Sequence, residues 1–137
     1  MPQLAVSHLT HTLITAGVLG VMYAFLSATV IVSRIKNRVT LGDGGNKQLL
    51  TRIRAHANFG EYVPFVLILM GLLELGGGSS TLLTWGGVLL VIARALHALG
   101  VWAGVARHPL RIAGTAMTLF LLVYGSISAI LIGYHFG

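Results

Sequence analysis

The stretch RIRAHANFGEYVPF, which runs from Arg52 to Phe65, contains a cation, an amide and a carboxylate at helical spacing. Arg54, Asn58 and Glu61 are four and three residues apart, so an α-helix would place them in one narrow stripe. At a rise of about 1.5 Å per residue, Glu61 would lie about 10 Å further along the helix axis than Arg54. Such a stripe suits a small zwitterionic ligand that carries carboxylates and an ammonium group.

The other polar residues of this segment occupy two faces of the expected helix. Tyr62 borders the stripe, whereas Arg52 and His56 would project to the opposite side. Arg54 has an alternative interpretation, because an arginine near a helix end often extends its guanidinium to the membrane interface without binding a ligand. The stripe is therefore a candidate site whose chemistry depends on what surrounds it.

Arg94 and His97 form a second pair, three residues apart in a later apolar run. An ionisable side chain at membrane depth costs at least about 2.5–3.5 kcal/mol, so Arg94 and Glu61 should each face a partner or a wet cavity. One alternative is an Arg94–Glu61 ion pair that only joins two helices, and His97 could equally be an interhelical hydrogen bonder. We expect no metal site, because no histidine has a carboxylate or cysteine at ligand spacing.

The composition indicates a membrane protein with a single domain over residues 1–137. Hydrophobic residues make up 55 % of the chain and charged residues 9 %, against roughly 25 % charged residues in soluble domains. Lysine and arginine number nine against three acidic residues, but no aromatic–basic array accompanies them, so we expect no nucleic-acid partner. Because the chain has no cysteine, any thiol chemistry must come from a ligand.

Long apolar segments predict four transmembrane helices, at about residues 7–33, 48–75, 81–106 and 109–134. The uncharged run from Leu13 to Val32 would span about 30 Å, the thickness of a bilayer core. Pro109 is well placed in the first turn of the last helix. Because the connections are short, we predict an all-α membrane protein in which the helices form an up-down bundle.

The basic residues are distributed unevenly among the connections. The second connection follows Glu74 and contains no lysine or arginine, whereas the first and third are flanked by Arg34, Lys36, Arg38, Lys47, Arg52, Arg54, Arg107 and Arg111. Basic connections remain on the cytoplasmic side of a membrane. We therefore expect the first and third connections in the cytoplasm and both termini outside.

The motifs resemble those of a known family. The segment RAHANFGEYVPF, residues 54–65, resembles the hallmark of the MAPEG family, the membrane-associated proteins of eicosanoid and glutathione metabolism. That pattern is approximately Arg-Ala-His/Gln-x-Asn-x-x-Glu-Tyr-x-Pro. The segment RHPLR, from Arg107 to Arg111, resembles the Arg-x-Pro-x-Arg entry to the last helix in the prostaglandin E synthase branch. The GDGGN loop at residues 42–46 and the short connections are similar to bacterial members.

The resemblance implies a homotrimer that binds glutathione, as a co-substrate, between neighbouring subunits near the cytoplasmic side. At matching positions, Arg54, Asn58 and Glu61 would hold glutathione, with Glu61 on its ammonium group. Arg111 would be the catalytic residue that stabilises the thiolate. The resemblance also assigns glutathione contacts to either Arg34 or Arg38, and to Tyr62, His97 and Arg107.

The implied chemistry is consistent with ordinary acid–base behaviour. A free thiol has a pKa near about 8.5, and a nearby cation favours the thiolate. An arginine does not lose its proton, so Arg111 would act as an electrostatic stabiliser and not as a base. We therefore expect a membrane-embedded glutathione transferase or peroxidase, acting on lipophilic electrophiles or hydroperoxides that the lipid concentrates. The expected location is the bacterial inner membrane, with the active site toward the cytoplasm.

Three positions depart from the prostaglandin E synthase branch. Ala57 replaces an arginine, Ile112 replaces a serine proposed to assist the thiolate, and Thr115 replaces a tyrosine. A prostaglandin-specific activity is therefore not expected. The first alternative is a non-catalytic structural or small-ligand-binding membrane protein of the same fold. The second is a transporter or channel that uses the intramembrane polar residues as a relay, although the sequence contains no inverted repeat or broken helix.

Overall fold

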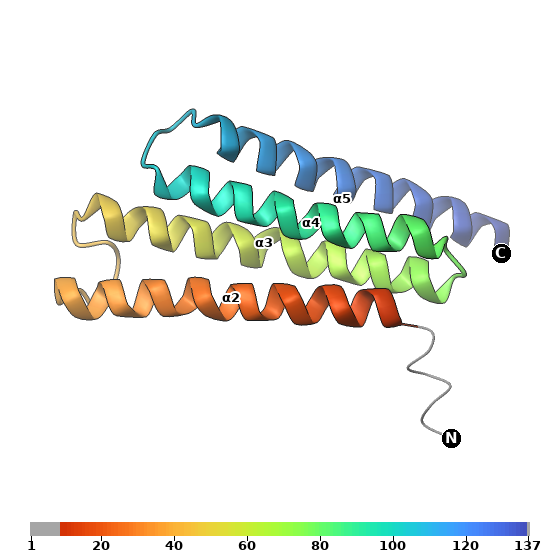
Figure 1. The fold of residues 1–137 in the computed structure, drawn as a ribbon, viewed down its shortest axis with the longest axis horizontal. Helices are drawn as coiled ribbons and strands as arrows, with labels where there is room; N and C mark the ends of the chain where they lie inside the picture. Colours follow the sequence, from red (N-terminus) through yellow and green to blue (C-terminus); the bar gives the residue numbers. More distant parts are fainter. Residues whose placement is uncertain (1–8, 137) are drawn as a thin grey trace, which may run out of the picture.

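The computed structural model describes residues 9–136, and within that range the chain forms four helices and no strand. In chain order they are α2 (Thr10–Asn37), α3 (Lys47–Leu75), α4 (Ser80–Trp102) and α5 (Pro109–Phe136). Each is long and apolar enough to cross a membrane. The helices alternate in direction along the bundle (Figure 1). The predicted all-α membrane fold with four transmembrane helices is therefore confirmed.

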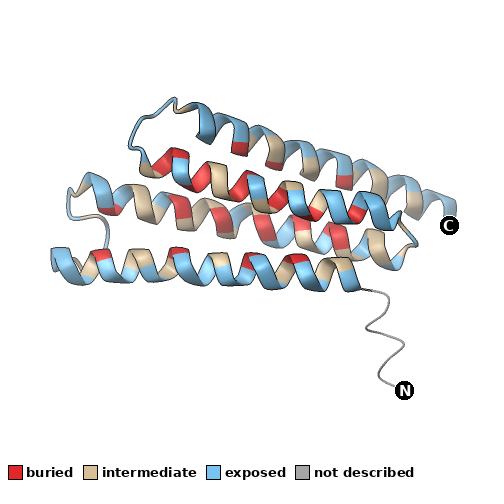
Figure 2. Cartoon of the chain, viewed as in Figure 1, coloured by how far each residue is buried: buried red, intermediate tan, exposed pale blue. Residues whose placement is uncertain are grey.

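α3 and α4 occupy the centre of the bundle, where each packs against all three other helices. α2 and α5 lie on opposite flanks (Figure 1). Buried residues gather on the inward faces, whereas the outward faces are largely exposed and apolar (Figure 2). The core comprises Leu19, Leu26, Ala55, Phe59, Val63, Val66, Leu90, Ala98 and Val101. An outward apolar surface of this kind is stable in lipid but not in water.

The connection between α2 and α3 is held by hydrogen bonds between the two helix ends. α2 continues to Asn37, beyond the expected end near residue 33, because Arg34 and Lys36 in its last turn interact favourably with the helix dipole. Asn46 caps α3: its Oδ1 accepts from the backbone N–H of Leu49 at 3.0 Å. Its Nδ2 donates to Asn37 Oδ1 at 2.7 Å, which joins the two ends.

α4 ends at Trp102, about one turn before the expected end at residue 106. Gly104 then adopts a φ of 71°, a left-handed conformation that favours glycine and ends the helical path. α5 begins at Pro109, as predicted. The connection between these helices is therefore longer than the sequence pattern indicated.

α4 and α5 approach each other closely because glycines lie at their contact. A Cβ at Gly114 would lie 2.6 Å from the backbone nitrogen of His97, and one at Gly100 would collide with the backbone of Arg111. Small residues of this kind let helices pack backbone against backbone in lipid. These two contacts bring the first two turns of α5 against the last turns of α4.

Glu74 closes the opposite end of the bundle, where α3 ends beside the start of α2. Its half-buried carboxylate accepts hydrogen bonds from the backbone N–H groups of His11 and Thr12, each at 2.8 Å. Leu9, at the N-cap of α2, supplies no side-chain cap of its own. Glu74 therefore caps α2 from a neighbouring helix. The expected start of α2, near residue 7, lies outside the described residues.

Candidate functional site

The side chain of Arg94 lies at the centre of a polar cluster between α3, α4 and α5. It is only 1 % exposed. Its Nη2 donates to Asn58 Oδ1 at 2.7 Å, and its Nη1 donates to Thr118 Oγ1 at 3.3 Å. The guanidinium carbon is 5.7 Å from the centroid of the Phe59 ring, within cation–π range. These contacts offset part of the cost of burying the charge.

The alternative ion pair between Arg94 and Glu61 is not present among the residues that the structure describes. The guanidinium bonds to Asn58 and Thr118 instead, while Glu61 is exposed on the surface of α3. Arg54 is exposed as well, and Asn58 is half-buried between them. Because α3 is helical throughout this segment, the three residues of the stripe share one face.

Arg52 and His56 project to the opposite side of the segment, as predicted, and this side faces α2. Arg52 Nη1 donates to the carbonyl of Thr29 at 3.3 Å, and His56 Nε2 lies 3.0 Å from Ser27 Oγ. The His56 ring stacks on Tyr23 with a centroid distance of 4.6 Å. These two residues therefore stabilise the packing of α2 on α3 and lie apart from the stripe.

Helical spacing places His97 beside Arg94 on α4, and the tertiary structure brings Tyr62 of α3 near Arg94 and Arg111 of α5 near His97. His97 is buried and interacts electrostatically with both Arg94 and Arg111. Tyr62 lies one turn after Asn58 on α3 and is close to Arg94. Arg111 is exposed, and its Nη1 donates to the carbonyl of Ala106 at 3.3 Å. One cation of the cluster is thus buried, and a second faces outward.

Two buried nitrogens of this cluster have no hydrogen-bond partner within the described part of the chain. They are Nε of Arg94 and Nδ1 of His97. A buried polar atom without a partner is costly, and native structures usually satisfy it with water or a ligand. The cluster therefore has unused donor and acceptor capacity close to the stripe on α3.

The other predicted contact residues lie near the same end of the bundle but have local roles. The guanidinium of Arg34 donates to the carbonyls of Thr40 and Gly42, at 3.3 and 2.9 Å, and so holds the α2–α3 connection. Arg38 is the C-cap of α2, with a φ of 54°. Arg107 is exposed in the α4–α5 connection. The structure gives none of these three side chains a described contact with Arg94.

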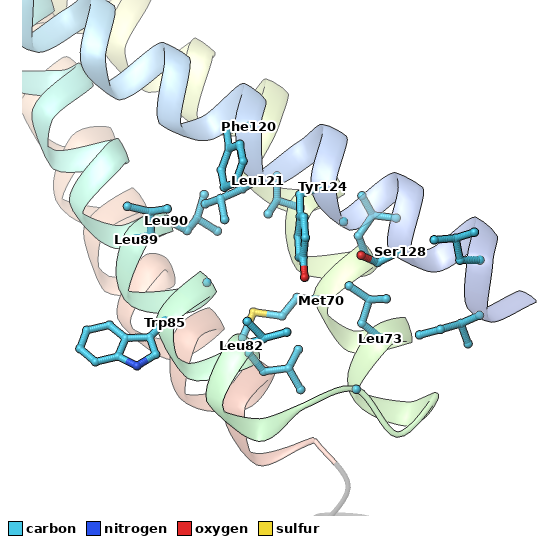
Figure 3. A pocket seen from close by; sticks show the side chains of 18 residues that line it. Met70, Leu73, Leu82, Trp85, Leu89, Leu90, Phe120, Leu121, Tyr124 and Ser128 are labelled. Carbon is cyan, nitrogen blue, oxygen red and sulfur yellow. The ribbon is translucent and has the colours of Figure 1, made fainter.

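An apolar cavity of about 580 Å³ lies between α3, α4 and α5, toward the end of the bundle that carries the α3–α4 connection (Figure 3). Its lining is apolar except for the hydroxyls of Tyr124 and Ser128 and the indole nitrogen of Trp85. A Cβ built on Gly86 would have no neighbour within 4 Å, so this glycine leaves space in the lining. The cavity was not predicted from the sequence, although glycines within the apolar runs are consistent with such a space.

The cavity ends close to the polar cluster. Leu90 lines the cavity four residues before Arg94 on α4, and Leu121 lines it three residues after Thr118 on α5. One helical turn, about 5 Å of rise, separates each pair. A molecule in the cavity would therefore lie one turn from the buried guanidinium.

Comparisons with known proteins relate the chain to one family. A sequence model of the MAPEG family matches residues 12–131. The inner membrane protein YecN of Escherichia coli strain K12 and its counterpart in E. coli O6:H1 are each 33 % identical over 87 residues, which is 58 % of this chain. The match covers 66 % of each relative, so the chain spans just under two thirds of their length. No solved structure matches the chain at a significant level.

Proposed function

Because the chain belongs to the MAPEG family, we propose that it binds glutathione through the α3 stripe and Arg111 and uses the bound thiol in transferase or peroxidase chemistry. The second substrate is a lipophilic electrophile or hydroperoxide that enters from the bilayer. Its similarity to the inner membrane protein YecN supports a location in the inner membrane. The proposed functional unit is a homotrimer.

One observation carries this proposal: Asn58, Tyr62 and His97 gather around the buried Arg94, and Arg111 lies near His97. His97 and Arg111 lie within about two turns of the α4–α5 connection, one of the two basic connections. By the positive-inside rule this end faces the cytoplasm. The start of α2 and the end of α5 lie at the opposite end of the bundle, which would then be outside (Figure 1). In the candidate site, arginines outnumber the one carboxylate, that of Glu61, and two buried nitrogens have no described partner. This arrangement fits a ligand with net negative charge.

The residues present fit glutathione, which carries two carboxylates, one ammonium and one thiol. Arg54 offers a planar guanidinium that can hold a carboxylate with two hydrogen bonds. Glu61 offers an exposed carboxylate for the ammonium. Both side chains are exposed on a single subunit, which is consistent with a site completed by a neighbouring subunit of the proposed trimer.

The role of Arg111 follows from its charge and place. When bound, glutathione would supply the nucleophilic thiol, and Arg111 would favour its deprotonated form electrostatically. The close contact of Gly100 with the backbone of Arg111 holds the start of α5 against α4. His97 is buried near both guanidinium groups, and its Nδ1, which has no partner among the described residues, could orient the ligand.

The cavity between α3, α4 and α5 is the site we propose for the apolar part of the second substrate. Its volume of about 580 Å³ is within the range of about 300–1,000 Å³ that is typical of small-molecule pockets. Its lining excludes charged molecules, and its inner end lies one turn from Arg94. A lipophilic molecule could therefore be held beside a polar site without leaving the bundle.

Binding and turnover can be tested in sequence with the full-length protein in detergent. Isothermal calorimetry and thermal shift with glutathione test binding, and conjugation of chlorodinitrobenzene tests turnover. Arg54→Ala is expected to weaken binding, and Arg111→Ala to lower turnover, while Lys36→Ala removes an exposed cation outside the site and serves as the control. Absence of any stabilisation at millimolar glutathione would refute the binding proposal.

A second candidate function is a glutathione-binding protein of this fold that lacks turnover. It is favoured by the first turns of α5, where Ile112 is apolar and the Thr115 hydroxyl donates to the carbonyl of Arg111 at 2.9 Å. That hydroxyl already has a backbone partner and is less available to assist a thiolate. Wild-type binding with equal conjugation rates in wild type and Arg111→Ala would favour this second function.

A further inference from the structure

We propose that Arg94 is a positioning residue that makes Asn58 a hydrogen-bond donor toward the ligand. The ligand must then present an acceptor, such as a peptide carbonyl, between the groups held by Arg54 and Glu61. This inference rests on the proposed function for the identity of the ligand. The orientation of Asn58 is a property of the protein alone and can be tested without a ligand.

The orientation of the Asn58 amide follows from the chemistry of its neighbour. A guanidinium group has five N–H donors and no acceptor, whereas a side-chain amide has one oxygen acceptor and one NH₂ donor. The atom that lies 2.7 Å from Arg94 Nη2 must therefore be Oδ1, because the opposite orientation would place two donors together. Nδ2 is consequently directed away from Arg94.

Arg94 itself is held in place before any ligand arrives. Its second hydrogen bond goes to Thr118 Oγ1, and that hydroxyl donates in turn to the carbonyl of Gly114 at 2.8 Å. The Phe59 ring lies within cation–π range of the guanidinium. A side chain that is 1 % exposed and fixed from three sides cannot turn away at little cost. The Asn58 amide is thus preorganised, which reduces the entropy lost on binding.

The free donor of Asn58 lies on the face of α3 that forms the candidate site. Within the described residues, Nδ2 has no hydrogen-bond partner. Asn58 is half-buried between the exposed Arg54 and Glu61. The face therefore presents, over about 10 Å, a cation, a donor that cannot become an acceptor, and a carboxylate.

This order selects a chemical class of ligand. To match Arg54, Asn58 and Glu61 in turn, the ligand must carry an anionic group, a hydrogen-bond acceptor and an ammonium group in that order along its length. A peptide thiol with a free α-amino group has all three, because its amide carbonyls supply the acceptor. A small thiol without a carbonyl would leave the Asn58 donor unsatisfied and lose affinity. We therefore expect the site to prefer peptide thiols to simple alkyl thiols.

The experiment uses two substitutions that differ in donor chemistry. Arg94→Lys keeps a donor-only group behind Asn58, whereas Arg94→Gln introduces an amide oxygen that can accept from Nδ2 and so releases the orientation. Each variant is made in the wild-type background and with Asn58→Ala, which forms a double-mutant cycle. Thermal unfolding in detergent first establishes that each variant is folded. If Arg94→Gln does not fold, Arg94→Lys is compared with the wild-type residue in both backgrounds.

Glutathione affinity is then measured by calorimetry. In the wild-type background we expect Arg94→Gln to weaken binding by about tenfold and Arg94→Lys by less than about threefold. With Asn58→Ala, the two Arg94 variants should bind equally, because Arg94 would act through Asn58. An equal loss for Arg94→Gln in both backgrounds would show a direct charge effect and overturn the inference.

The orientation is measured independently in the ligand-free protein by ¹⁵N-NMR of the Asn58 side-chain NH₂ group. The resonance is assigned by its loss in Asn58→Ala. We expect its chemical shift to be retained in Arg94→Lys and changed in Arg94→Gln. An unchanged resonance in Arg94→Gln would overturn the positioning role, whether or not glutathione binds. Failure of the wild type to bind glutathione, with the resonance behaving as expected, would instead refute the proposed function.

Discussion

The carboxylate of Glu74 at the end of α3 accepts two hydrogen bonds from Thr12 in the first turn of α2. One comes from the backbone N–H at 2.8 Å and the other from the hydroxyl at 2.6 Å. An N-terminal helix turn has unpaired N–H groups and a positive partial charge, and both favour a carboxylate. A side chain distant in sequence thus performs the capping that α2 does not perform for itself.

Replacement of this cap is expected to destabilise the bundle. Glu74→Ala should lower the free energy of unfolding by about 1–2 kcal/mol, because it leaves backbone donors of α2 without their partner. Thermal unfolding in detergent measures the effect. Glu61→Ala is the matched control: Glu61 is also on α3 but is exposed, so its removal should change stability by less than about 0.5 kcal/mol. Equal unfolding temperatures for the two variants would contradict the capping role.

The close contact of α4 with α5 predicts that an added methyl group lowers the stability of the protein at Gly114 but not at Gly86. Gly114→Ala should cost about 1–3 kcal/mol, because its Cβ would lie 2.6 Å from the backbone nitrogen of His97 and the helices would have to separate. Gly86→Ala has open space around its Cβ and should be neutral or slightly stabilising. Denaturation of both variants in the same detergent provides the comparison.

Filling the cavity should remove the preference for longer apolar substrates. For a homologous series of 2-alkenals, kcat/KM in the wild type should rise with chain length by up to about fourfold per methylene. Gly86→Leu should flatten this dependence, because the side chain occupies the cavity. Gly20→Leu adds the same group on the exposed surface of α2 and should leave the dependence unchanged. A steep chain-length dependence in Gly86→Leu would exclude the cavity as the substrate site.

Removal of the Arg111 charge should alter the pH dependence of turnover in a defined direction. A cation beside a thiol lowers the thiol pKa, so Arg111→Ala should raise the pKa of bound glutathione toward its ordinary value of about 8.5. The rate near neutral pH should then fall by about 10- to 100-fold and recover as the pH rises. The acid limb of the pH–rate profile measures this shift. Arg111→Lys should keep most of the acid limb in place, and a profile unchanged in Arg111→Ala would rule out the proposed role.

The number and approximate position of the membrane helices could be predicted from the sequence because both depend on local properties. The length of an apolar run sets whether a helix can span a bilayer, and helical periodicity places Arg54, Asn58 and Glu61 on one face. The helix ends were less predictable. α2 runs on to Asn37 and α4 stops at Trp102, since caps and left-handed residues act over only one turn.

The interhelical partners were decided by the tertiary structure alone. Spacing indicated that Arg94 needs a partner at depth, but it did not distinguish Glu61 from Asn58 and Thr118, and it did not indicate that Glu74 caps α2 or that a cavity lies between three helices. Which side chains meet across a bundle depends on how closely the helices approach and how they are rotated. Those quantities arise from the packing of all the helices together, so no single segment of the sequence contains them.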